Sequence, residues 1–162
     1  MQSFESILVV IDPTQMEQPA LDRALSLAKA NGASVELFMC VYHSSIVSNW
    51  FLDDQELENA KIKYIEKERN WLEGIAKQAS ASGIEFKLDV HWQTPVYQAI
   101  IDKSIRSGAD LIIKSTHKHP TINKLFMTPN DWQLIKNSSV PVLLAKSRES
   151  TGYTSVVAAI DP

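Results

Sequence analysis

Two features of this sequence are able to support chemistry: one carboxylate and one basic segment. Asp12 directly follows the apolar run Ile7-Leu8-Val9-Val10-Ile11, a position from which its side chain can polarise a water molecule. One carboxylate alone, however, is not an acid–base mechanism. The basic segment either attracts an anionic ligand by charge or is a solvated surface loop. It consists of Lys114, His117, Lys118, His119 and Lys124.

The motifs of common enzyme classes are absent from the sequence. It has no G-x-S-x-G elbow around a serine, no Walker phosphate loop and no G-x-G-x-x-G. His117 and His119 are close enough to suggest a metal, but zinc needs more ligands, and no cysteine or further histidine lies nearby in sequence. We therefore expect neither an enzyme nor a metal site.

The composition is that of an ordinary globular protein. The chain has 162 residues, 44% apolar and 22% charged, with a formal net charge of −3. This length suits one domain with a sizeable core. The net charge and the lack of basic–aromatic interleaving argue against nucleic acid or an anionic membrane as partner. No secretory or membrane-length apolar segment is present, so we expect a cytoplasmic protein.

Apolar runs alternate with helical periodicities along the chain. Residues 7–11 form a β-branched apolar run, typical of a strand buried on both faces of a parallel sheet. Pro141 cannot donate a ladder hydrogen bond, so the last strand is expected at a sheet edge that serves association. The alternation predicts an open, doubly wound α/β sheet with helices on both faces. The expected strands are residues 7–11, 34–41, 84–90, 111–114 and 140–146, and the expected helices are residues 19–30, 53–81, 95–106 and 128–137.

The start of the last predicted helix has a pattern of its own. Thr128 suits the N-cap, Pro129 the first helical position and Asp131 the third. Pro129 removes one amide from the helix N-terminus, and Asp131 places a negative charge in the first turn. Both residues oppose the binding of a phosphate there.

The end of the chain repeats its beginning. Ser155-Val156-Val157-Ala158-Ala159-Ile160-Asp161-Pro162 matches Ser6-Ile7-Leu8-Val9-Val10-Ile11-Asp12-Pro13 in character. A repeat at a domain-sized offset indicates a duplicated domain. We expect residues 1–146 to form one domain, 147–154 a linker and 155–162 the first strand of a second copy. Such a cut strand is expected to add to an available sheet edge rather than lie free.

These segments together resemble the universal stress protein family. Ile7 to Asp12 is similar to that family's first strand and aspartate. Further resemblance is found in Ser107-Gly108-Ala109-Asp110-Leu111-Ile112-Ile113, similar to the entry into the fourth strand, and in Val140-Pro141-Val142-Leu143-Leu144, similar to the fifth. The repeat, with Thr128-Pro129-Asn130-Asp131-Trp132 and Val90-His91-Trp92, resembles the tandem-domain universal stress protein E type, of which this chain looks like the first domain.

The resemblance implies a five-stranded parallel sheet of order 3-2-1-4-5 and a ligand cleft at the carboxyl ends of the first and fourth strands. Many members of the family bind ATP there through glycines after the fourth strand and a Gly-Ser before the last helix. This sequence has Ser115 and Lys118, then Thr128 and Pro129, at those places, and glycine-free loops wrap phosphate poorly. We therefore expect no cofactor, with ATP disfavoured. The residues expected to line the cleft are Asp12, Pro13, Val41, Ser115, His117, Lys118 and Thr128.

One apolar segment has no assigned role. Trp50-Phe51-Leu52 either packs locally, contacts the second half or lines an apolar pocket. Cys40 is the only cysteine and is expected to be a buried, inert thiol. Trp71, Trp92 and Trp132 are interpreted as packing anchors.

The resulting functional hypothesis is a non-catalytic ligand-binding and regulatory domain of the stress response with a degenerate nucleotide site. Its expected ligand is small and anionic or partly apolar. Its expected partners are the second domain and another copy in a homodimer. The alternatives are a weak ATP-binding or ATP-hydrolysing protein and a scaffold half that supports a functional second domain.

Overall fold

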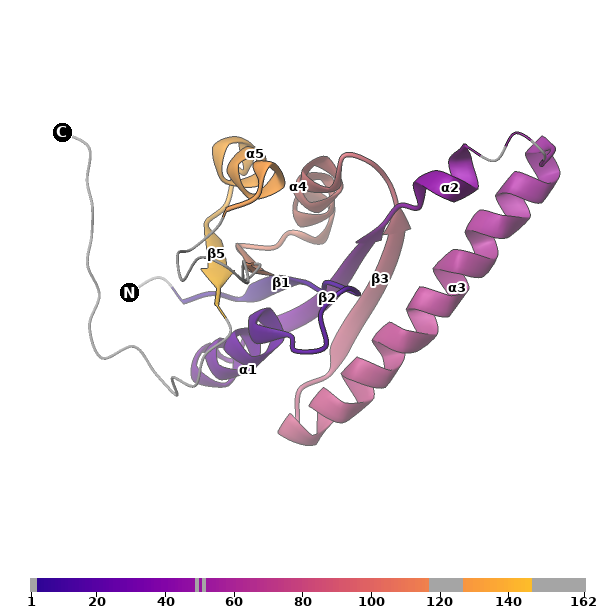
Figure 1. The fold of residues 1–162 in the computed structure, drawn as a ribbon. Helices are drawn as coiled ribbons and strands as arrows, with labels where there is room; N and C mark the ends of the chain where they lie inside the picture. Colours follow the sequence, from indigo (N-terminus) through magenta and orange to yellow (C-terminus); the bar gives the residue numbers. More distant parts are fainter. Residues whose placement is uncertain (1–2, 49, 51, 117–126, 147–162) are drawn as a thin grey trace, which may run out of the picture.

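The computed structural model describes residues 3–48, 50, 52–116 and 127–146. Five strands form one parallel sheet in the order β3-β2-β1-β4-β5 (Figure 1). The predicted fold class and strand order are therefore confirmed. The strands are β1 (Ser6–Val10), β2 (Ser34–Val41), β3 (Phe86–Trp92), β4 (Leu111–Ser115) and β5 (Val142–Ala145).

Helices cover both faces of the sheet, as Figure 1 shows. One face packs against α1 and α3, and α4 and α5 lie together on the other. A short helix, α2, joins β2 to α3 and was not predicted. The helices are α1 (Pro19–Asn31), α2 (Ser44–Val47), α3 (Asp54–Ala79), α4 (Val96–Ser107) and α5 (Pro129–Asn137), with a 3₁₀ turn at Ser80–Ser82.

The central strands supply two separate apolar cores. Ile7 and Val9 of β1 point into the core beneath α1 and α3, whereas Leu8 and Val10 point into the core beneath α4 and α5. Leu8 is fully buried. Alternate side chains of a strand face opposite sides, so a strand covered on both sides must be apolar throughout. The continuous apolar run of β1 thus places Asp12 where the chain leaves the sheet.

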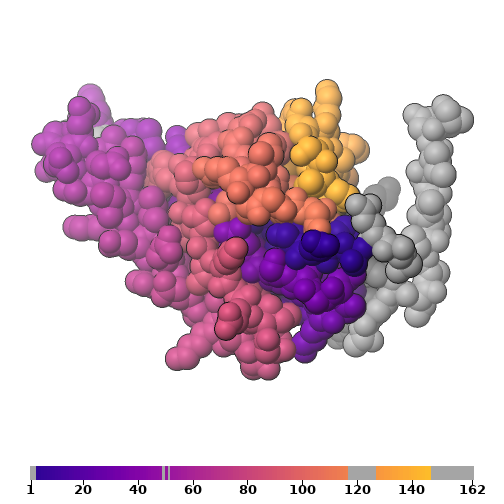
Figure 2. Space-filling view, turned by 180° about the vertical axis from the view of Figure 1, so that it is seen from behind, coloured from indigo at the N-terminus to yellow at the C-terminus, as the bar shows by residue number. Residues whose placement is uncertain are grey.

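The long helix α3 extends beyond the sheet. Asp53 caps it, because its Oδ1 accepts the Glu56 amide at 2.8 Å while the Glu56 side chain accepts the Asp53 amide. Its C-terminal half buries Leu72 and Ala76 against the sheet. Together with α2, its first turns stand out at one end of the molecule (Figure 2). This projection brings Tyr64 over the carboxyl ends of the strands.

Two predicted strand boundaries were wrong. Strand β3 runs to Trp92, because β2 continues to Val41 and pairs with it there. Strand β5 begins at Val142, one residue after Pro141, whose carbonyl still accepts the Ile112 amide at 3.0 Å. Proline lacks the donor that a ladder needs, so the regular strand starts behind it.

β5 is the last strand in the order within the described part of the chain. The predicted edge position is confirmed, and association through this edge stays a prediction. The predicted linker and second-copy strand, residues 147–162, lie outside the described residues.

Two tryptophans depart from the predicted packing role. Trp132 on α5 is 61% exposed, and Trp71 is also exposed. Trp92 does pack, since its ring lies 5.8 Å from that of Tyr64 and 5.7 Å from that of Tyr42. Trp50 is 89% exposed and belongs to neither apolar core, and Phe51 lies outside the described residues.

Candidate ligand-binding site

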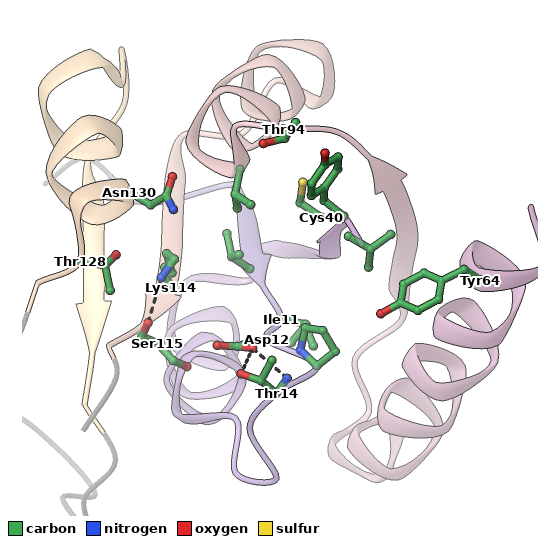
Figure 3. Close-up of a pocket in the computed structure, with 15 residues that line it drawn as sticks. Ile11, Asp12, Thr14, Cys40, Tyr64, Thr94, Lys114, Ser115, Thr128 and Asn130 are labelled. Carbon is green, nitrogen blue, oxygen red and sulfur yellow. Dashed lines mark hydrogen bonds between the residues drawn. The ribbon is translucent and has the colours of Figure 1, made fainter. Parts of the chain in front are cut away.

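A cavity of about 420 Å³ opens at the carboxyl ends of β1, β2 and β4. Strand order reverses between β1 and β4, so the connections on either side of them diverge and leave a crevice. The volume lies within the range of small-molecule sites. One wall is apolar and aromatic, and the opposite wall is polar (Figure 3).

The apolar wall comes mainly from strand ends and the projecting helix. Val10 and Val41 end β1 and β2 there, and Ile11 follows β1. Tyr64 reaches across from α3 (Figure 3). Tyr64 is held in place by an edge-to-face contact with Trp92, with an interplanar angle of 90°. Fixed rings of this kind favour a planar or apolar ligand surface. The other members of this wall are Cys40, Tyr42 and Val96.

Asp12 lies at the floor of the cavity, held by its own loop. Its Oδ1 accepts the Thr14 amide at 2.9 Å and the Thr14 hydroxyl at 2.6 Å (Figure 3). Its Oδ2 accepts the Gln15 side chain at 3.0 Å. The buried side chain of Gln18 bonds to both the amide and the carbonyl of Asp12. This is an Asx turn, which fixes the loop after β1. The carboxylate therefore helps to fix the geometry of this loop.

Ser115 also has a structural bond. Its hydroxyl accepts the Ala20 amide at 3.1 Å and so satisfies a donor in the first turn of α1. Ser115 is 2% exposed. A hydroxyl already engaged in this way orients the β4 end relative to α1.

Lys114 and Asp131 form an ion pair across the polar wall. Lys114 Nζ lies 2.8 Å from Asp131 Oδ1, and the two side chains are 12% and 0% exposed. Lys114 Nζ also donates to the Ser115 carbonyl at 3.3 Å (Figure 3). The sequence placed Lys114 in a basic segment that either attracts an anionic ligand or is a solvated surface loop. The structure corrects this, because a buried carboxylate neutralises its ammonium.

Asp131 remains charged in this setting. Burial raises the pKa of its carboxyl, but the Lys114 ammonium and the Thr128 donors outweigh burial and hold that pKa below its ordinary value of 3.8. The ion pair is therefore formed at neutral pH.

The predicted start of α5 is confirmed. Thr128 is the N-cap, with its hydroxyl accepting the Asp131 amide at 3.2 Å, and Pro129 follows it. Asp131 Oδ2 in turn accepts the Thr128 amide at 2.7 Å and the Thr128 hydroxyl at 2.9 Å. A capping box thus uses donors that a helix N-terminus otherwise offers to a phosphate.

The structure brings together five of the seven residues expected in the cleft: Asp12, Pro13, Val41, Ser115 and Thr128 line the cavity. His117 and Lys118 lie outside the described residues. Sequence reasoning missed Tyr64, whose only signal was its place in the covered stripe of α3. It also missed Tyr42, Thr94, Val96 and Asn130, which stand just past predicted elements or at their first turn.

Cys40 is part-buried in the cavity wall, and its Sγ donates to the Gln93 carbonyl at 3.2 Å. Burial raises the pKa of the thiol from 9.0 to about 11, against a smaller lowering by a backbone hydrogen bond with Gln93.

Alkylation of Cys40 by iodoacetamide at pH 8 is accordingly expected to be about 100-fold slower than that of an unperturbed cysteine, because only the thiolate reacts. Mass spectrometry over a time course measures the rate. The same chain unfolded in urea is the control, and equal rates in the two states would contradict this placement of the thiol.

Within the described residues, no three His, Cys, Asp or Glu side chains gather as metal ligands. In that same part of the chain, none of the helices combines the length and apolar character needed to cross a bilayer.

This chain is similar in sequence to known proteins. The profile of the Universal stress protein family matches residues 3–146. Universal stress protein E of Photorhabdus laumondii is 34% identical over 161 residues, which cover 99% of this chain and 51% of that protein. The chain thus spans about half the length of the curated relatives it matches.

Solved structures agree with the fold. The structure of hypothetical protein MJ0577 superposes with a TM-score of 0.74 at 22% identity, covering 92% of this chain and all of the other. A universal stress protein from Archaeoglobus fulgidus in complex with dAMP superposes with a TM-score of 0.58 at 16% identity, covering 90% of this chain and 100% of the other. Given the profile match over nearly all the described residues, the chain belongs to the universal stress protein family.

Proposed function

We propose that this domain is a non-catalytic, ligand-binding regulator of a cytoplasmic stress response. Its ligand is a small, partly apolar molecule the size of a nucleoside. The observation that carries the proposal is the cavity itself, with fixed aromatic rings on one wall and hydrogen-bonding groups on the other. The cavity lies where the strand order reverses between β1 and β4, and open α/β folds bind their ligands at such a point. The Archaeoglobus fulgidus relative that holds dAMP supports the nucleoside class.

The engaged side chains support the proposal of a non-catalytic role. The Asp12 carboxylate is committed to its loop and the Ser115 hydroxyl to α1, so neither is positioned as base or nucleophile. The weak expected binding of phosphate supports a degenerate nucleotide site, because the capping box engages the amides of Thr128 and Asp131 at the helix start. Binding of a ligand, not its conversion, is then the function.

Adenosine is the probe that tests the proposal. Asn130 is exposed and lines the cavity from the first turn of α5 (Figure 3). Asn130→Trp is expected to weaken adenosine binding at least about tenfold, or 1.4 kcal/mol, because the larger side chain fills the entrance of the cavity. Calorimetry measures the binding. Gln133→Trp, an exposed position on the same helix that does not line the cavity, is the matched control. Equal binding by both variants would contradict the proposal, as would no binding to the parent chain.

A second function concerns the whole protein. The curated relatives are about twice as long as this chain, and residues 155–162 repeat its first strand. This favours a scaffold role for this half, in which it supports a second domain of the same fold. Comparison of adenosine and MgATP binding by this chain and by a full-length relative would separate the two functions.

A further inference from the structure

The polar wall of the cavity contains one ammonium whose charge is already neutralised. Lys114 enters from β4 and Asp131 from the first turn of α5, and they meet at 2.8 Å with the carboxylate fully buried. The neighbouring Ser115 carbonyl takes a second interaction of the ammonium. An ammonium has three donor hydrogens, and the described residues engage two of them, which leaves one donor for a ligand atom. A ligand at this wall therefore meets a hydrogen-bond donor within a neutral pair.

The neutral pair discriminates between ligands by charge. A phosphate at Lys114 would also approach the buried Asp131 carboxylate, and like charges repel strongly where water is excluded. An uncharged acceptor, such as a hydroxyl, carbonyl or ring nitrogen, accepts the same hydrogen bond without that repulsion. The start of α5 offers an anion little compensation, because the amides of Thr128 and Asp131 are engaged in the capping box and Pro129 has no amide.

We infer that Asp131 is a specificity-determining residue: from behind the cavity wall it pairs with Lys114, which lines the cavity, and so makes the site select uncharged ligands over anionic ligands with the same ring. This inference rests on the proposed use of the cavity as a ligand site. It assigns Asp131 a second role beside helix capping, and that role acts through Lys114.

Asp131→Asn separates the two roles. Asparagine has the same shape and retains an oxygen that can accept from Thr128, but it releases the Lys114 charge. Binding of adenosine and of AMP is measured by calorimetry on the 162-residue chain. The parent chain is expected to bind adenosine at least as tightly as AMP. In Asp131→Asn the affinity for AMP is expected to rise about tenfold or more, as one charge-assisted hydrogen bond allows, with adenosine changed by less than about twofold.

The double variant Lys114→Gln/Asp131→Asn is the matched control. It has no charge at either position, so the gain in AMP affinity should vanish. Persistence of the gain in the double variant would overturn the inference, as would an unchanged ratio of AMP to adenosine affinity in Asp131→Asn. Circular dichroism checks that each variant is folded. Asp131→Ser, a shorter neutral side chain with a hydroxyl near Thr128, replaces Asp131→Asn if the latter does not fold.

Inorganic phosphate provides a readout that does not need a nucleoside. It is expected to raise the melting temperature of Asp131→Asn relative to chloride at equal ionic strength, because a ligand that binds only the folded state stabilises it. The parent chain and the double variant should show no such rise. If adenosine binds none of the proteins, the proposed function fails. The phosphate comparison still decides the inference, which is overturned if phosphate affects all the proteins alike.

Discussion

Lys114→Met is expected to lower the free energy of unfolding by about 3–5 kcal/mol, because it leaves the charge of Asp131 buried and uncompensated. The carboxylate is 0% exposed, and the Lys114 ammonium lies 2.8 Å from it. The remaining contacts to Thr128 satisfy only the other oxygen. Urea denaturation followed by circular dichroism measures the change. Lys136→Met is the control, because Lys136 is exposed and lies on α5, the helix that contains Asp131. Its free energy of unfolding should stay within about 0.5 kcal/mol of the parent.

The pH dependence provides an independent check. The pKa of Asp131 is lowered in the folded state, so its stabilising contribution is present above its ordinary value of 3.8 and is lost as pH falls through the folded pKa. The difference between the parent and Lys114→Met should therefore shrink in acid below that value. Lys114→Met/Asp131→Asn should recover most of the loss at neutral pH. A deficit that is the same at all pH values, or not relieved in the double variant, would show that charge is not its cause.

MgATP is expected to bind this chain no more tightly than millimolar. A triphosphate site built on glycine loops and a helix N-terminus uses several charge-assisted hydrogen bonds, each contributing roughly 1.5–3 kcal/mol. Here Pro129 has no amide, and the capping box engages the amides of Thr128 and Asp131. Two or three missing bonds amount to roughly a thousandfold or more in affinity, since 1.4 kcal/mol is tenfold. Lys114 cannot replace them, because its charge is paired.

Calorimetry with MgATP at high protein concentration measures this low affinity. Magnesium chloride without nucleotide is the blank, and AMP tests whether a shorter anion is tolerated better. A micromolar constant, together with a triphosphate located between Asp12 and Thr128, would contradict the proposal that the nucleotide site is degenerate.

Much of the fold was predictable because burial on two faces imposes a strong pattern. The apolar run of β1 and the alternation of strands with helices predict a parallel sheet from the residues alone. The resemblance added the strand order, which sequence spacing does not determine. The ends of the strands were harder to predict, because they depend on the neighbouring strand with which each one pairs. The extension of β3 to Trp92 depends on β2 reaching Val41, a contact between distant segments.

The site was predictable only where local sequence determines it. The cap formed by Thr128, Pro129 and Asp131 follows from neighbouring residues and was predicted. The pairing of Asp131 with Lys114 depends on how α5 packs against β4, so the sequence pattern contains no sign of it. In the same way, Tyr64 belongs to the periodic stripe of α3, but only the projection of that helix places its ring over the cavity.

The exposure of Trp132 marks another limit. Its neighbours Asp131 and Leu134 are buried on α5, and a helix has room on its inner face for only part of each turn. The tryptophan faces outward because the inner positions are taken, which composition alone does not reveal.

The central claim is that the cavity between the ends of β1, β2 and β4 is the ligand site. An NMR titration of the labelled chain with adenosine tests it most directly. We expect saturable chemical-shift changes at Val41, Tyr64, Ser115 and Thr128, with little change at the outward-facing Trp132 and Ile105. Saturating adenosine that shifts none of the cavity residues, or shifts centred on Trp132 and Ile105, would contradict it.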